Sequence, residues 1–106
     1  MSISHDVKRL IFHLYDEKWS PDITDNDVKR ILNQKNVYYF FHKDNGNIVG
    51  MVALYIVELF SRKVGVIEET VVLPWYRGHG IARELMHRAI EKARDIGVTC
   101  VELTVK

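Results

Sequence analysis

Long apolar runs and paired cysteines are both missing from this sequence of 106 residues. No apolar stretch approaches the roughly 20 residues that a membrane-spanning helix requires, so we expect no membrane span. The first residues also lack the apolar segment of a secretory signal peptide. The single cysteine, Cys100, can form no disulfide within the chain, and its apolar surroundings predict a small buried side chain rather than a nucleophile. These absences predict a cytoplasmic protein.

An excess of either charge is missing as well. The sequence has 15 Lys and Arg residues against 14 Asp and Glu residues, and the net charge of +1 gives no electrostatic reason to bind nucleic acid or a membrane surface. The five histidines are scattered without the spacing of metal ligands, so we expect no metal site. The length suits one domain with a single core, covering residues 1–106.

Periodic patterns predict the order of helices and strands. A first helix, capped by Ser4 and Asp6, runs to about Lys18. After the break at Ser20-Pro21-Asp22, a second helix runs from Thr24 to near residues 33–36. The remaining elements are strands over residues 37–41, 48–60, 64–73 and 98–105, and a long helix from Ile81 to a stop at Gly97.

The connections between the strands predict how they pair. The segment Asp44-Asn45-Gly46-Asn47 is a strong hairpin signal, so the strands on either side of it should pair antiparallel. A helix separates the last two strands, which should therefore be parallel neighbours. The order α-α-β-β-β-α-β predicts an α/β (α+β) fold with a mixed sheet.

The connection over residues 71–82 is the most informative part of the sequence. Its apolar run ends at Pro74, and a short turn with Arg77, Gly78 and Gly80 precedes the long helix. The free N–H groups of a first helical turn attract an anion, and glycines let a phosphate approach the backbone closely. The Gly-Lys-Ser/Thr of a Walker loop and the third glycine of a dinucleotide fingerprint are both missing.

This loop resembles the acyl-CoA-binding motif of the GNAT superfamily of N-acetyltransferases, Arg/Gln-x-x-Gly-x-Gly/Ala after a strand. Arg77, Gly80 and Ala82 occupy its fixed places, and the element order matches most of the family's core. The resemblance implies acetyl-CoA as acetyl donor, with its pyrophosphate on the loop amides and its thioester near the strand end. Trp75 and Tyr76 either cover part of the donor or clamp the helix start. The residues expected to bind the donor are Val71, Val72, Leu73, Arg77, Gly78, His79, Gly80, Ile81 and Ala82.

Both ends of the chain depart from the family's pattern. Family members usually begin with a strand, and after the last strand they continue with a helix and two strands that supply a tyrosine able to protonate the leaving thiolate. We therefore expect a C-terminally truncated GNAT-like core. The alternative is a non-catalytic acyl-CoA-binding or interaction module. Without the missing strands, the strand at 98–105 would be an edge, which predicts a homodimer through it.

The reaction that the resemblance implies is direct attack of a primary amine on the thioester carbonyl, with a backbone N–H near Val71 stabilising the oxyanion. A carboxylate must take the amine's proton, and Glu68 and Glu69 are the candidates, with Glu58 a weaker third. Neighbours in a strand point to opposite faces, so at most one of the pair faces the acceptor. The sequence leaves open which one, and also whether the acceptor is a small molecule or a peptide.

Overall fold

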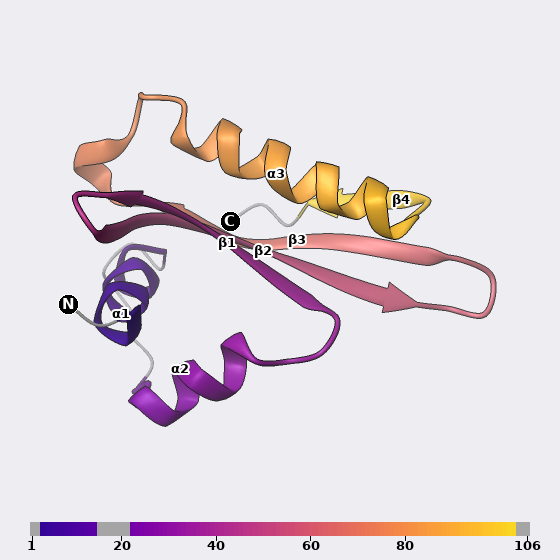
Figure 1. Ribbon diagram of the computed structural model, residues 1–106, viewed down its shortest axis with the longest axis horizontal. Helices are drawn as coiled ribbons and strands as arrows, with labels where there is room; N and C mark the ends of the chain where they lie inside the picture. Colours follow the sequence, from indigo (N-terminus) through magenta and orange to yellow (C-terminus); the bar gives the residue numbers. More distant parts are fainter. Residues whose placement is uncertain (1–2, 15–21, 104–106) are drawn as a thin grey trace.

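Eight elements follow one another in the computed structural model, which describes residues 3–14 and 22–103 (Figure 1). Their bounds are α1 Ile3–Leu14, α2 Asp25–Leu32, β1 Val37–Asp44, β2 Asn47–Glu58, β3 Lys63–Val72, the 3-10 turn η1 Pro74–Tyr76, α3 Ile81–Ile96 and β4 Cys100–Leu103. The predicted order α-α-β-β-β-α-β is confirmed, and η1 is an additional turn before α3. The predicted extension of α1 to Lys18, the first two residues of the break at Ser20-Pro21-Asp22 and the last strand's end at Val105 lie outside the described residues.

The four described strands form one mixed sheet in the order β1-β2-β3-β4. β1 and β2 pair antiparallel, as do β2 and β3, whereas β3 and β4 are parallel. The hairpin between β1 and β2 closes where Asp44 pairs with Asn47. Asn45 and Gly46 both have positive φ, 50° and 80°, which is the left-handed backbone that favours Asn-Gly in such turns. Both predicted pairings are therefore confirmed.

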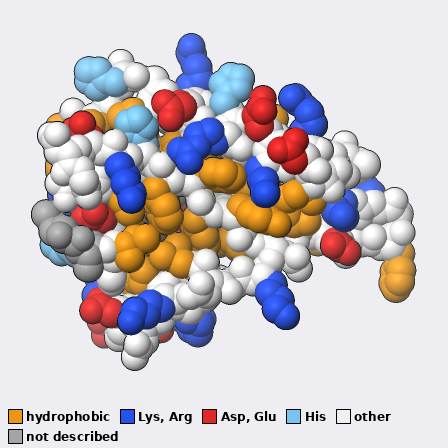
Figure 2. Space-filling view, viewed as in Figure 1, with side chains coloured by type: hydrophobic (Ala, Val, Ile, Leu, Met, Phe, Trp, Pro, Cys, Tyr) orange, Lys and Arg blue, Asp and Glu red, His pale blue; other side chains and the backbone are white. Residues whose placement is uncertain are grey.

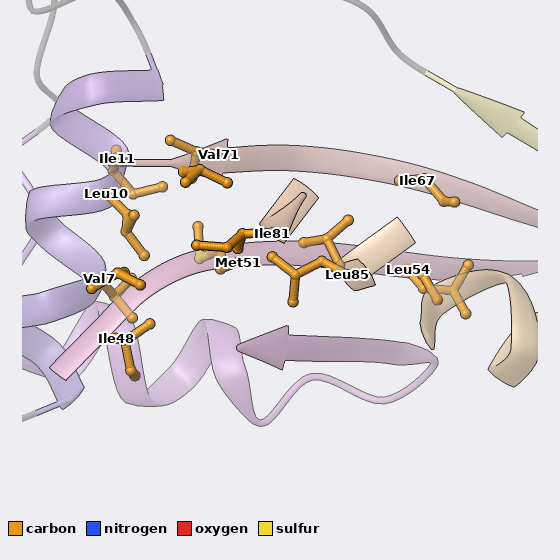
Figure 3. Packing of buried hydrophobic residues seen from close by; sticks show 14 of the residues in the cluster. Val7, Leu10, Ile11, Ile48, Met51, Leu54, Ile67, Val71, Ile81 and Leu85 are labelled. Atoms are coloured by element: carbon orange, nitrogen blue, oxygen red, sulfur yellow. The ribbon is translucent and has the colours of Figure 1, made fainter. Parts of the chain in front are cut away.

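Helices cover both faces of the sheet: α3 lies on one side, and α1 and α2 lie on the other (Figure 1). The α3 face is held by a buried stripe at helical spacing. Its buried residues are Ile81, Leu85, Ala89 and Ala93. Gly50 of β2 lets α3 approach closely, because a Cβ there would lie 3.1 Å from a methyl carbon of Ile81. On the other face, Leu10 and Ile11 of α1 point toward the sheet near Met51 and Val71 (Figure 3).

The predicted caps of the first helix have a different role. α1 begins at Ile3, so Ser4 and Asp6 lie inside its first turn, and both are buried. The Ser4 hydroxyl donates to a carboxylate oxygen of Asp25 at 2.6 Å, and Asp6 accepts a hydrogen bond from the backbone N–H of Ile48 at 2.9 Å. Both side chains therefore bind other elements, because the faces that carry them are packed against α2 and the start of β2.

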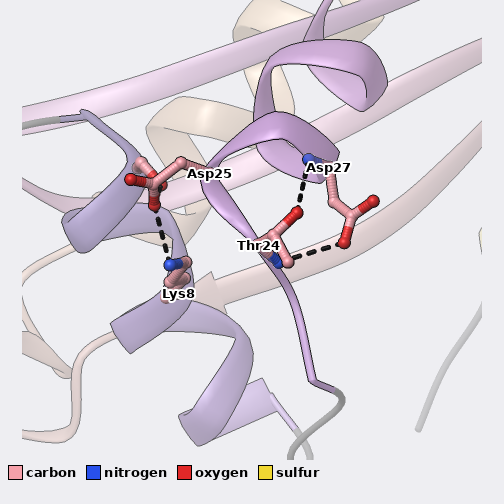
Figure 4. A network of polar contacts seen from close by, with 5 residues as sticks. Lys8, Thr24, Asp25 and Asp27 are labelled. Carbon is pink, nitrogen blue, oxygen red and sulfur yellow. Dashed lines mark hydrogen bonds and ion pairs between the residues drawn. The ribbon is translucent and has the colours of Figure 1, made fainter.

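The start of α2 at Thr24, as the sequence predicts, is fixed by a capping box. The Thr24 hydroxyl accepts from the backbone N–H of Asp27, and the Asp27 carboxylate accepts from the backbone N–H of Thr24 (Figure 4). That second hydrogen bond lowers the pKa of Asp27. Lys8 of α1 contacts Asp25 at 2.8 Å, and this contact lowers the pKa of Asp25. The two helices are thus joined by polar contacts above the sheet.

The last strand is exposed along its whole described length, and the expectation of a buried Cys100 is wrong. β4 is the outermost strand of the sheet, and its register with β3 extends only from Val64 opposite Cys100 to Ile67 opposite Leu103. An apolar residue is buried only where a second layer covers it, and within the described chain nothing covers β4 sufficiently.

The surface carries mixed charge. On the face shown in Figure 2, Lys and Arg side chains alternate with Asp and Glu side chains along the α3 side, and hydrophobic side chains gather in a band below them. Over residues 3–14 and 22–103, no helix has the length and apolar character needed to cross a membrane. The same ranges contain no cluster of three His, Cys, Asp or Glu side chains suited to a metal ion.

Candidate functional site

A β-bulge in β3 lies at the two candidate glutamates. Ala53 of β2 pairs with Glu68, but Met51 pairs with Val71, so two residues of β3 lie opposite a single residue of β2. The first of these two, Glu69, has a φ of 54°, in the left-handed region that glutamate rarely adopts. Such backbone costs about 1–3 kcal/mol and is concentrated at functional sites. The bulge therefore marks this point of β3 as a candidate site.

The bulge directs Glu69 toward a cavity of about 230 Å³ between the sheet and the helices α1 and α2. Most of its wall is aliphatic, and the polar lining residues are few. The described lining residues are Val7, Ile11, Ile23, Val28, Ile31, Leu32, Gln34, Tyr39, Met51, Tyr55 and Glu69. Glu68 is half-buried and is not among them. The local bulge, rather than simple alternation along the strand, decides which glutamate faces the cavity.

Two tyrosines connect with Glu69 inside this cavity. The Tyr55 hydroxyl donates to Oε1 of Glu69 at 3.1 Å, and the Tyr39 and Tyr55 hydroxyls are 3.3 Å apart. Burial raises the pKa of both phenols above the ordinary value of 10.0, so both are neutral donors at physiological pH. Because the Tyr55 hydroxyl donates its hydrogen bond to the carboxylate, its oxygen is left to accept a hydrogen bond from Tyr39. Sequence analysis missed these tyrosines, which carried no signal beyond their preference for strands.

The loop before α3 presents unoccupied backbone donors. Gly78 and Gly80 have φ values of 82° and 80°, and a Cβ built on either meets no atom within 4 Å. The first intrahelical hydrogen bond runs from the N–H of Glu84 to the carbonyl of Gly80. The N–H groups of residues 81–83 precede it, and within the described chain no side chain caps the helix at Gly80. A diphosphate fits this loop, because it needs close approach and free N–H groups.

Arg77 stabilises the end of the strand that leads into the loop. Its Nε donates to the carbonyl of Val72 at 3.1 Å. The N–H of Leu73 donates in the opposite direction, to the carbonyl of Val49 on β2 at 2.9 Å. Since backbone groups alternate sides along a strand, the N–H of Val71 points toward β2 and that of Val72 points away from it.

Among the described residues, the edge of β3 next to the loop is open on the side away from β2. β4 pairs with β3 only as far as Ile67, so residues 68–72 have no partner strand on that side among the described residues. The Val72 N–H lies on this open edge, a few residues from the bulge and from the glycine loop. The sequence predicts the thioester at this edge.

The aromatic residues beside the loop, Trp75 and Tyr76, contact α1 and the β1–β2 hairpin. Tyr76 donates a hydrogen bond to Asp44 at the turn between β1 and β2, and this bond raises the pKa of Tyr76. Trp75 is 61% exposed and meets the ring of His13 of α1 edge to face, with 5.7 Å between ring centroids. His79 is exposed, as expected for a side chain between the two glycines. The loop is therefore tied to both the sheet and α1.

Curated proteins with related sequences are N-acetyltransferases. An aminoalkylphosphonate N-acetyltransferase of Salmonella typhimurium is 38% identical over 75 residues, which are 69% of this chain and 49% of that protein. An uncharacterized N-acetyltransferase of Methanocaldococcus jannaschii is 40% identical over 80 residues, 73% of this chain and 35% of that protein. The chain therefore spans about half or less of the length of these curated relatives.

Solved structures of acetyltransferases share the fold. An acetyltransferase of Agrobacterium tumefaciens matches with a TM-score of 0.83 and 26% identity, over 96% of this chain and 74% of that one. An acetyltransferase of Trypanosoma brucei matches with a TM-score of 0.80 and 28% identity, over 96% of this chain and 75% of that one. The model of the acetyltransferase (GNAT) family matches residues 6–106. The chain belongs to this family, as its glycine loop and mixed sheet predict.

Proposed function

We propose that this chain binds acetyl-CoA at the open edge of β3 and transfers the acetyl group to a primary amine held in the cavity between the sheet, α1 and α2. Family membership supports acetyl transfer. The positions of the loop and the cavity support the assignment of acetyl-CoA to the loop and of the amine to the cavity. The bulge residue Glu69 lines the cavity, and the loop follows the end of the same strand a few residues later. One substrate can therefore be delivered to the other across the strand.

The donor side uses backbone groups of this chain. The N–H groups of Gly78, Gly80 and the first turn of α3 hold the diphosphate, and Arg77 keeps the strand end in place through its contact with Val72. Acetyl-CoA, when bound, supplies an acyl carbonyl activated as a thioester. The N–H of Val72, on the open edge of β3, is placed to donate to negative charge that develops on that carbonyl oxygen. Val71 and Leu73 direct their N–H groups to β2 and serve to hold the strand.

The acceptor side uses Glu69. An amine attacks only as the neutral form, so its proton must be removed, and Glu69 is the carboxylate that lines the cavity. Tyr55 fixes the carboxylate through its 3.1 Å hydrogen bond. The single observation that carries this proposal is the bulge, since it holds Glu69 in a costly left-handed conformation and aims its carboxylate into the cavity.

Two measurements on the same preparation test the proposal. Calorimetry measures acetyl-CoA affinity, and release of the free CoA thiol in the presence of a panel of amines measures transfer. We expect micromolar binding and amine-dependent thiol release. Binding without release from any amine would favour a non-catalytic acyl-CoA-binding module, and absence of binding would contradict the donor site.

A further inference from the structure

The cavity that holds Glu69 is apolar over most of its wall, and this restricts what can occupy it. Seven of the eleven described lining residues are aliphatic or Met side chains from α1, α2, their connection and β2. They are Val7, Ile11, Ile23, Val28, Ile31, Leu32 and Met51. Of the four polar lining residues, Tyr39, Tyr55 and Glu69 form one connected group, and the amide of Gln34 donates to the carbonyl of Ile31. The described cavity wall is therefore mainly aliphatic, with one polar group that contains a carboxylate.

From this lining we propose that the acceptor is a primary amine carried on an uncharged apolar body, either a short alkyl chain or a single ring. The ammonium group enters toward Glu69 and Tyr55, and the body packs against the aliphatic wall. This proposal rests on the proposed function and adds the chemical class of its acceptor.

The charge of the lining argues against the other classes of amine. Glu69 is the only ionisable carboxylate among the described lining residues, and no Lys or Arg is among them. An aminoalkylphosphonate, the substrate in the name of the Salmonella relative, carries an anion that would find no cationic partner among the described lining residues. A polyamine would bring additional cations, and the described lining residues offer no carboxylate besides Glu69 to receive them. Both would lose more from desolvation than one carboxylate returns.

The size of the cavity agrees with a small body. An engineered apolar cavity of about 150 Å³ in another protein binds benzene. The volume here, about 230 Å³, is larger than that and still well below the volume that most drug-sized ligands need. A single ring or a chain of a few carbons with one amino group matches this space.

Two measurements test the proposal. The first is the affinity of the chain for amines in buffer without acetyl-CoA, and the second is the turnover of the same amines with acetyl-CoA. In the series from ethylamine to pentylamine, we expect each added methylene to raise affinity about fourfold, about 0.8 kcal/mol. Phenethylamine should bind at least tenfold more tightly than 2-aminoethylphosphonate or spermidine, and its kcat/KM should exceed theirs by the same factor. A flat alkylamine series, or a preference for the phosphonate or for spermidine, would overturn the proposal.

Two matched variants locate the effect. Ile31→Asn places an amide in the aliphatic wall, and Ile90→Asn makes the same change on α3, where Ile90 is 39% exposed and does not line the cavity. We expect Ile31→Asn to weaken phenethylamine binding at least tenfold with unchanged acetyl-CoA affinity, and Ile90→Asn to change neither. Equal phenethylamine affinity in both folded variants would overturn the proposed body site. If the unmodified chain does not bind acetyl-CoA, the proposed function itself is contradicted. That result is distinguishable from failure of the proposed acceptor class, which leaves acetyl-CoA binding intact.

Discussion

The hydroxyl of Tyr55 on β2 donates a 3.1 Å hydrogen bond to the carboxylate of Glu69 on β3, where the bulge interrupts the pairing of these two strands. Both residues line the same cavity. The contact couples a carboxylate in a left-handed backbone conformation to a neutral phenol. It fixes the direction of the Glu69 carboxylate, which lines the proposed acceptor cavity.

Replacing the two adjacent glutamates separately tests the base. Glu69→Gln keeps the shape of the side chain and removes the carboxylate, so we expect kcat/KM near neutral pH to fall about 10²-fold or more. The loss should shrink at high pH, where the amine is already neutral. Steady-state rates across pH 6–10 measure both effects.

Glu68→Gln is the matched control, because Glu68 is the adjacent residue and lies outside the cavity lining. We expect wild-type rates from this variant. If Glu68→Gln loses rate and Glu69→Gln does not, the direction assigned by the bulge is wrong. Wild-type rates in both variants would remove both carboxylates from the reaction.

The glycine loop can be tested against a second glycine with the same backbone. Gly80→Asp introduces bulk and negative charge where the diphosphate is proposed to lie, and we expect acetyl-CoA affinity to fall at least tenfold, about 1.4 kcal/mol. Gly46→Asp in the hairpin is the control, since Gly46 has the same φ of 80° and the same open surroundings. Calorimetry on both folded variants separates the two effects. An equal loss of affinity in both, or in neither, would contradict the loop assignment.

The raised pKa of Tyr55 predicts a loss of stability in alkali. Burial, the largest cause, favours the neutral phenol in the folded state, whereas the unfolded phenol ionises near pH 10.0. The folded state therefore holds a proton that the unfolded state has lost, so this stabilisation is complete below pH 10 and declines as the pH rises above it. We expect Tyr55→Phe to make the fall of the melting temperature between pH 9 and 11.5 less steep. Tyr38→Phe, at an exposed position of β1, should leave the slope unchanged, and identical slopes for the two variants would count against this account.

The exposed last strand predicts self-association. Val101 and Leu103 on β4 are 38% and 57% exposed at an edge of the sheet, and an edge strand is a template for pairing with a second copy. We propose a homodimer through the strand over residues 98–105, which Val101→Lys should shift toward the monomer. Val57→Lys, on β2 at 42% exposure, is the control and should leave the dimer intact. Light scattering over a concentration series measures the change, and a monomer at high micromolar concentration in the unmodified chain would refute the dimer.

Local features of the sequence determined most of the fold. The Asn45-Gly46 turn, the helix start at Thr24 and the apolar stripe of α3 all depend on residues within a few positions of each other, so the pattern alone predicts them. The glycine loop is of the same kind. Gly78 and Gly80 adopt left-handed backbone that few other residues tolerate, and the strand and helix on either side make the family recognisable from the sequence.

Tertiary structure decided the details that require a partner far along the chain. Asp6 is a buried acceptor for Ile48 rather than a cap, because packing of α1 on the sheet brings a free N–H to it. Cys100 is exposed because β4 lies at the edge of the described sheet, and the apolar sequence around Cys100 does not reveal that position. The orientation of Glu69 toward Tyr55 depends on a bulge, which is a mismatch in length between two paired strands. The sequence of either strand alone does not predict that mismatch. The residues that form the candidate site therefore follow only from the pairing of β2 with β3.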